Sequence, residues 1–136
     1  SVPRHTFENI LQTGVYTINQ VNKSIYKQAH QTSARYDKDE SEFEETGLTP
    51  EYLNEFSAPF VKESRLKYSV KFVESKHLEI NGTELVIGEI VDVYLDETAL
   101  QSDGFLDLQA IDTVAVTGLD SYHTANKLTR LPYAKK

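Results

Sequence analysis

The sequence contains no cysteine and no methionine, and each absence carries information. Without cysteine the chain forms no disulfide and no thiolate metal site, so its redox compartment is left undecided. Without methionine, Ser1 is not a translation start, and we expect that something upstream of it has been removed or left out. The chain also lacks an apolar run as long as a membrane-spanning helix, and its start does not resemble a signal peptide.

Basic residues are outnumbered, with 14 Lys and Arg against 21 Asp and Glu and a formal net charge of −7. This balance argues against a surface for nucleic acid, although a local basic group could still hold a phosphate. The 136 residues are 39% hydrophobic and 26% charged, which suits an ordinary globular protein with its own core. We therefore expect one domain over residues 1–136.

The first half of the chain predicts short helices around one strand. Thr6 can cap a helix that Gly14 ends, and β-branched and aromatic residues predict a strand over residues 15–21. Further helical stretches are predicted from Ser24, from Ser41 to Gly47, and from Thr49 through Phe56; the last two begin with a capping-box spacing and a Thr-Pro pair.

The second half alternates with a period of two residues, which predicts strands. Alternation over residues 66–72 is followed by Asn81-Gly82, a strong hairpin signal. The run 85–95 is apolar on both faces and predicts a strand that is buried on both sides or closes a barrel. A short helix over residues 106–111, a last strand over 113–117 and a mostly irregular tail complete the prediction.

Familiar catalytic signatures are missing from the sequence. It has no G-x-G-x-x-G, no phosphate loop and no H-E-x-x-H, and its four histidines show no ligand spacing. Asp120, Ser121 and His123 include the residue types of a catalytic triad, but sequence neighbours rarely form one. The residues therefore predict no catalytic group and no metal site, and the acidic run 37–45 is best explained as a solvated face.

The segment Pro3-Arg4-His5-Thr6 directly precedes the first predicted helix. Unpaired N–H groups and the positive end of the helix dipole favour anions there, and a guanidinium and a hydroxyl would complete a phosphate cradle. The alternative is an ordinary helix cap with an exposed arginine. The residues by themselves favour the cap.

Several segments together resemble the flavin reductase-like proteins with an FMN-binding split barrel. The resemblance rests on Pro3 to Ile10, Thr13 to Asn19, Ser41 to Thr49, Ala58 to Ser64, Asn81 to Ile90, Asp103 to Asp107 and Gly118 to Tyr122, in that order along nearly the whole chain. It implies a mainly β fold with peripheral helices, and residues 1–136 as the C-terminal portion of one such domain. Family members have strands and a Ser-rich turn that precede the region corresponding to residue 1. The backbone and hydroxyls of that turn meet the isoalloxazine ring, so the resemblance implies that residues setting the flavin redox potential lie outside residues 1–136.

The resemblance also implies a function. It predicts a homodimeric, cytoplasmic flavoprotein oxidoreductase that binds FMN and takes hydride from NADH or NADPH, with no catalytic side chain because the flavin performs the chemistry. By the same resemblance Arg4, His5 and Thr6 lie on the FMN phosphate side, and Tyr122 and His123 lie near the cofactor, while Asn9 is interpreted as structural. The alternatives are an electron-carrier module without turnover of its own, and a structural dimer that has lost flavin.

Overall fold

The computed structural model describes residues 5–136, which form mainly antiparallel strands with a few short helices. The helices are α1 (His5–Thr13), α2 (Tyr26–Gln31) and α3 (Glu42–Thr46), with a 3₁₀ turn η1 (Glu97–Ala99). The strands are β1 (Val15–Asn19), β2 (Pro50–Glu51), β3 (Phe60–Val61), β4 (Leu66–Leu78), β5 (Thr83–Leu95), β6 (Val114–Thr117) and β7 (Ser121–Thr124). No helix among residues 5–136 is long and apolar enough to cross a membrane.

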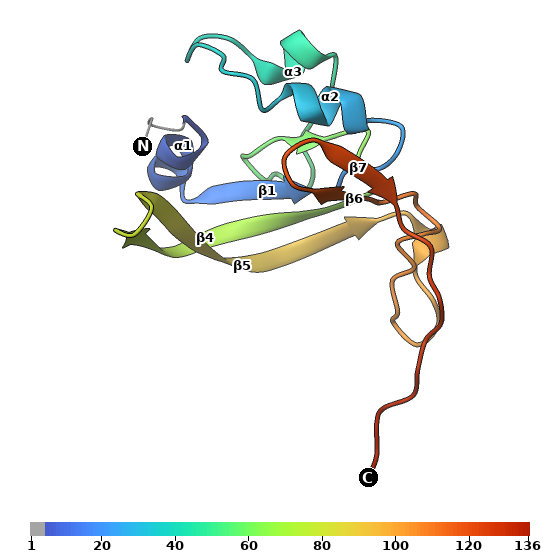
Figure 1. Ribbon diagram of the computed structural model, residues 1–136. Helices are drawn as coiled ribbons and strands as arrows, with labels where there is room; N and C mark the ends of the chain where they lie inside the picture. Colours follow the sequence, from blue (N-terminus) through green and yellow to red (C-terminus); the bar gives the residue numbers. More distant parts are fainter. Residues whose placement is uncertain (1–4) are drawn as a thin grey trace.

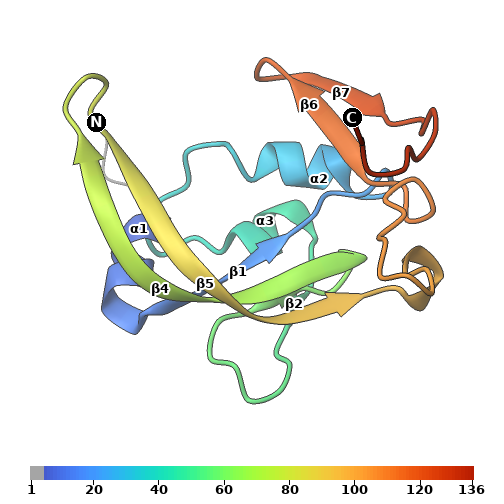
Figure 2. The ribbon, with the colours of Figure 1, turned by 90° about the horizontal axis from the view of Figure 1, so that it is seen from below.

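One sheet of three antiparallel strands, in the order β1-β4-β5, forms the base of the molecule. The three helices and the two small hairpins, β2–β3 and β6–β7, lie on one side of this sheet (Figures 1 and 2). The predicted turn at Asn81-Gly82 is confirmed, because it joins β4 to β5 and Gly82 adopts a φ of 64°. Two register shifts along β4 interrupt the pairing where the long strands bend in Figure 2.

The strand β5 differs from its predicted environment. Within residues 5–136 it pairs only with β4, so it is an edge strand. Its apolar side chains are largely exposed, with Ile90 at 56%, Val91 at 54% and Val93 at 48%. The prediction of burial on both faces is therefore wrong for these residues, and this edge leaves unpaired backbone groups beside apolar side chains.

Two side chains approach Gly88 in the middle of β5 so closely that they leave no room for a Cβ atom. The Tyr16 side chain reaches across the sheet from β1, and a Cβ on Gly88 would overlap its hydroxyl oxygen and Cγ1 of Val70. Val70 is 2% exposed and cannot move away cheaply. A residue without a side chain is therefore required at this position of β5.

Two predicted helices are absent from the described chain. Pro50 and Glu51 pair with β3 as strand β2, and Asn54 and Glu55 then adopt positive φ values of 49° and 59°, which no helix accommodates. Residues 106–111 form turns around a buried Ile111, which packs in a small core cluster with Leu66 and Ala99. The tail is also more ordered than predicted, since β7 pairs with β6.

Arg65 and Asp96 join the start of β4 to the end of β5. The Arg65 guanidinium donates from Nε and Nη2 to Oδ2 of Asp96, at 3.2 and 2.7 Å. The Thr98 hydroxyl and backbone N–H donate to Oδ1 of the same carboxylate. These hydrogen bonds, first from Arg65 and then from Thr98, lower the pKa of Asp96 from 3.8 to about 2.

The Asp96→Asn variant should change how stability depends on pH. A carboxylate whose pKa is lowered by folding stabilises the folded state above its unfolded pKa and loses that contribution as the pH falls through the folded pKa. We expect the wild-type protein to lose more stability than Asp96→Asn between pH 4 and pH 2. Denaturant unfolding of both proteins across this range measures it, and a constant difference between the two curves would contradict it.

Candidate functional site

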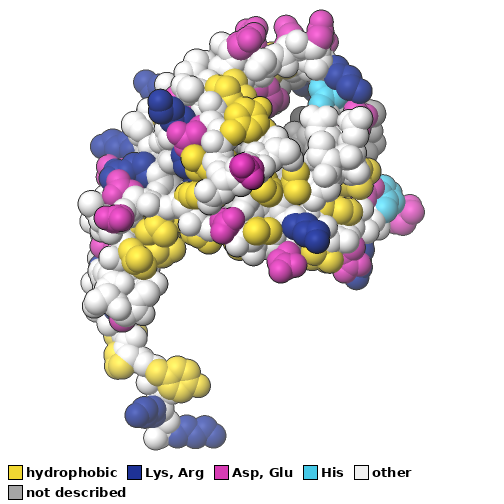
Figure 3. Space-filling view, turned by 180° about the vertical axis from the view of Figure 1, so that it is seen from behind, with side chains coloured by type: hydrophobic (Ala, Val, Ile, Leu, Met, Phe, Trp, Pro, Cys, Tyr) yellow, Lys and Arg dark blue, Asp and Glu magenta, His cyan; other side chains and the backbone are white. Residues whose placement is uncertain are grey.

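A cavity of about 450 Å³ opens between α1, β1, α3 and the segment 57–61. In the space-filling view the surface is hollowed between α1 and the acidic side chains over α3 (Figure 3). The lining residues come from four separate parts of the chain: Thr6, Asn9, Ile10 and Thr13; Val15, Tyr16, Thr17 and Asn19; Phe43; and Ser57, Ala58, Pro59 and Val61. The cavity falls within the size range of about 300–1,000 Å³ that is typical of sites for small organic ligands.

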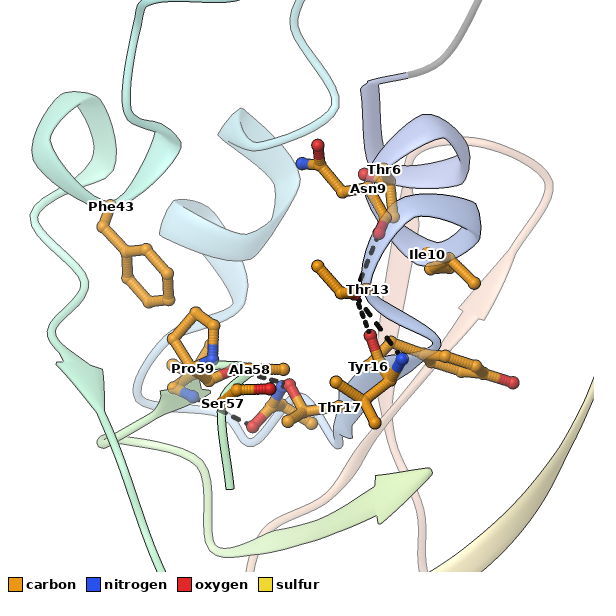
Figure 4. Close-up of a pocket in the computed structure, with 13 residues that line it drawn as sticks. Thr6, Asn9, Ile10, Thr13, Tyr16, Thr17, Phe43, Ser57, Ala58 and Pro59 are labelled. Carbon is orange, nitrogen blue, oxygen red and sulfur yellow. Dashed lines mark hydrogen bonds between the residues drawn. The ribbon is translucent and has the colours of Figure 1, made fainter. Parts of the chain in front are cut away.

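The first wall of the cavity is one face of α1. Ile10 is buried and anchors the helix, and Gly14 ends it with a φ of 74° while its N–H donates to the Ile10 carbonyl at 2.8 Å. Thr6, Asn9 and Thr13 recur at helical spacing and line the cavity together. The sequence thus builds a polar stripe on the helix face opposite α3 (Figure 4).

The opposite wall is the segment 57–61, and the sheet holds it in place. The Thr17 hydroxyl donates to the Pro59 carbonyl at 2.7 Å, and the Asn19 Oδ1 accepts from the Val61 N–H at 2.9 Å. Asn19 Nδ2 also donates to the Thr17 hydroxyl at 3.0 Å. These hydrogen bonds occupy the Thr17 and Asn19 side chains, so the two residues fix the shape of the wall rather than bind a ligand.

Lys67 on β4 fixes the same wall from behind. The residue is 8% exposed, although in the sequence it alternates with the apolar Leu66 and Tyr68, which predicts an outward-facing side chain. Its Nζ donates to Glu51 Oε1 and to the Val61 and Lys62 carbonyls, at 3.1, 3.1 and 3.2 Å. Because a buried ammonium needs such partners, the paired strands β2 and β3 are held against the sheet.

Three polar side chains in the cavity remain available for a ligand. Within residues 5–136 the side chains of Thr6, Asn9 and Ser57 have no hydrogen-bond partner in the protein, and all three residues are exposed to solvent. Figure 4 shows the Asn9 amide pointing into the space between α1 and α3, with the Phe43 ring and Pro59 across from it. The cavity can therefore hold a ligand that combines an apolar part with hydrogen-bonding groups.

The predicted site residues fall into three groups. Thr6 lines the cavity, although it lies inside α1 rather than at its cap, and Arg4 lies outside the described residues. His5 is exposed in the first turn of α1 and is not among the lining residues. The structure does not bring Tyr122 and His123 to this cavity within the chain.

Tyr122 and His123 lie on β7, far from α1 in both ribbon views (Figures 1 and 2). They line a separate depression of about 260 Å³, together with Tyr26 and Lys23. The Tyr122 hydroxyl is 3.1 Å from Nδ1 of His30, and His123 Nε2 is 3.0 Å from the Thr117 hydroxyl. Their assignment to the cofactor stays a prediction.

Sequence reasoning missed several cavity residues. The resemblance implies a structural role for Asn9, although its helical spacing from Thr6 and Thr13 places all three on one face. Phe43 and Ser57 lie far from α1 in the sequence, and no local pattern joins them to it. Among residues 5–136 the structure gathers no set of three His, Asp or Glu side chains that could hold a metal ion.

Comparisons with known proteins agree on the family. The family model described as "Flavin reductase like domain" matches residues 1–110. The chain is 80% identical to a protein of Shewanella frigidimarina with a split barrel domain of the flavin reductase kind; the TM-score is 0.94, and the match covers 97% of this chain and 67% of that one. Flavoredoxin of Desulfovibrio vulgaris (Miyazaki F) is 25% identical with a TM-score of 0.81, over 98% of this chain and 70% of its own.

The matches to curated relatives show how much of those longer proteins this chain spans. An uncharacterized protein of Aquifex aeolicus is 25% identical over 100 residues, which are 74% of this chain and 50% of that protein. The chain spans about half the length of the curated relatives that it matches. The similarity to the two solved structures confirms the predicted fold class, mainly β with peripheral helices in a split barrel. The chain belongs to the flavin reductase-like family.

Proposed function

We propose that this chain is the FMN-binding portion of a flavoprotein oxidoreductase, and that the protein reduces flavin with NADH or NADPH. The observation that carries the proposal is the cavity between α1 and the segment 57–61, in a chain of the flavin reductase-like family. When bound, the flavin would supply the hydride and electron chemistry, which is why the protein needs no nucleophile of its own.

The chemistry of the cavity fits FMN. A flat isoalloxazine ring finds apolar partners in Phe43, Pro59 and Val61, and the polar remainder of the cofactor finds hydrogen-bonding groups in Thr6 and Asn9. Arg4 and His5, next to Thr6 in the sequence, would add positive charge for the phosphate. In this arrangement α1 holds the anionic end and the segment 57–61 supports the ring.

The remaining predictions concern assembly and location. A homodimer would cover apolar surface, and the exposed Ile90, Val91 and Val93 of β5 support self-association. Tyr122 and His123 stay proposed cofactor residues, which would meet the flavin only from another copy or another arrangement of the chain. A cytoplasmic location also stays a proposal.

A second candidate is an electron carrier that binds FMN without turnover of its own. The observation in its favour is the similarity to flavoredoxin, at 25% identity and a TM-score of 0.81. The cavity serves both functions equally well, because each requires the same flavin.

Flavin binding and turnover separate these candidates. The purified full-length protein is titrated with FMN while flavin fluorescence is recorded, and NADH or NADPH oxidation is then followed with added FMN. Binding with turnover is the expected result, and binding without turnover indicates the carrier. A protein that binds no flavin would overturn both and leave only a structural role.

Replacing Arg4 by alanine should weaken FMN binding by about 10- to 100-fold, because a charge-assisted hydrogen bond to phosphate contributes about 1.5–3 kcal/mol. Riboflavin, which lacks the phosphate, should bind wild-type and variant protein equally. Fluorescence titration with both flavins measures the effect. Equal FMN affinity of the two proteins would remove Arg4 from the phosphate site.

A further inference from the structure

Asn9 occupies a place on α1 that the family resemblance left without a ligand role. Its side chain lines the cavity, and Figure 4 shows the amide pointing into the open space rather than toward the helix backbone. Within residues 5–136 it has no side-chain hydrogen-bond partner, whereas the neighbouring Thr13 hydroxyl donates to the Asn9 carbonyl at 2.9 Å. The amide is therefore free to donate and to accept toward a ligand.

The position of Asn9 along the helix selects the part of the ligand that it would meet. An α-helix rises 1.5 Å per residue, so Asn9 lies about 4.5 Å farther along the α1 axis than Thr6. In FMN a polyol chain with free hydroxyls links the phosphate to the ring. A ligand whose phosphate lies at Thr6 and whose ring lies against Pro59 and Phe43 must pass this chain in front of Asn9.

Chemical complementarity supports the same assignment. A hydroxyl both donates and accepts a hydrogen bond, and a side-chain amide offers both partners. On the far wall Ser57 presents a second hydroxyl that is also without a partner among the described residues. We infer that Asn9 is a positioning residue that binds the ribityl hydroxyls of the flavin, with Ser57 facing it across the cavity. This inference rests on the proposed function.

Three flavins that carry different parts of the cofactor test the assignment of Asn9 to the ribityl hydroxyls. FMN carries ring, ribityl chain and phosphate; riboflavin carries ring and ribityl chain; lumiflavin carries the ring alone. Asn9→Ala should weaken FMN and riboflavin binding by the same factor, about 3- to 10-fold, since a net neutral hydrogen bond contributes about 0.5–1.5 kcal/mol. Lumiflavin should bind wild-type and variant protein equally.

Controls separate ligand contact from folding. Gln12→Ala removes a similar amide from an exposed position of α1 that does not line the cavity, so it should leave all three affinities unchanged. Alanine favours helices more than asparagine does, so Asn9→Ala should fold, which thermal unfolding checks. Ser57→Ala provides a second variant with the same expected pattern.

The pattern of losses decides the inference. A loss for FMN alone would place Asn9 at the phosphate, and an equal loss for lumiflavin would place it at the ring; either result overturns the ribityl assignment, as does unchanged binding of all three flavins. A wild-type protein that binds no flavin would instead overturn the proposed function itself.

Discussion

The Thr6→Asp variant should lose FMN binding by about 100-fold or more while its fold becomes slightly more stable. Thr6 lines the cavity from the first turn of α1, where a carboxylate interacts favourably with the helix dipole by about 0.3–1 kcal/mol. The same carboxylate would lie beside a phosphate that carries a charge of about −1.5 to −2 at pH 7. Two like charges about 4 Å apart repel by about 4 kcal/mol at an effective dielectric constant of about 20, so repulsion dominates binding.

The neutral isostere Thr6→Asn is the matched control for this charge. It keeps the size of aspartate, so we expect a much smaller loss of FMN affinity and no gain in helix stability. Riboflavin should distinguish the variants little, because it has no phosphate. Raising the salt concentration toward 1 M shortens the Debye length to about 3 Å, so it should reduce the defect of Thr6→Asp. An equal loss for Thr6→Asp and Thr6→Asn would mean that shape rather than charge governs this end of the cavity.

Local patterns predicted those parts of the fold that local interactions determine. The hairpin at Asn81-Gly82 needs positive φ at its turn, and Gly82 provides it at 64°. Gly47 likewise ends α3 in the left-handed region with a φ of 74°, although Ser41 makes no side-chain capping bond. In these places the residue type and the required backbone conformation coincide within a few positions.

Predictions failed where distant pairing overrides a local signal. Thr49-Pro50 is a good helix start, yet Pro50 pairs with Val61 and Glu51 with Phe60 in the short sheet β2–β3. The apolar run 85–95 predicts burial, but burial requires partners on both sides, and within residues 5–136 β5 has only β4. The pattern of apolar residues indicates that a segment prefers an apolar environment. It does not indicate which other strand supplies that environment.

The residues of the candidate site likewise divide into those that a local motif predicts and those that only the fold brings together. A short motif at the start of a helix singles out Thr6, which lines the cavity from α1, and its contact with the FMN phosphate stays a prediction. Phe43 and Ser57 lie far from α1 in the sequence and line the same cavity, so no spacing rule could have found them. The burial of Lys67 could not be predicted for the same reason, since its partners are on β2 and at the end of β3.

The largest effect on stability is expected from Lys67→Met. Lys67 is buried, and its removal leaves Glu51 without its cation and the Lys62 carbonyl without a donor, while the Val61 carbonyl keeps only its hydrogen bond from the Ser64 N–H. Breaking a buried pair on one side costs about 3 kcal/mol or more, so denaturant unfolding should show a loss of about that size. Because Val61 lines the cavity, the loosened wall should also weaken FMN binding.

Two further variants test whether this loss of stability comes from the broken contacts of the Lys67 ammonium. Lys71→Met removes an exposed lysine from the same strand and should change the free energy of unfolding by no more than about 0.5 kcal/mol. Glu51→Gln keeps the ammonium on its two carbonyls, and Glu51 is 29% exposed, so this variant should lose less stability than Lys67→Met. If Lys67→Met and Lys71→Met were equally stable, Lys67 would not hold the wall. The segment 57–61 would then depend on the hydrogen bonds from Thr17 and Asn19, and Thr17→Val would become the more damaging change to both stability and FMN affinity.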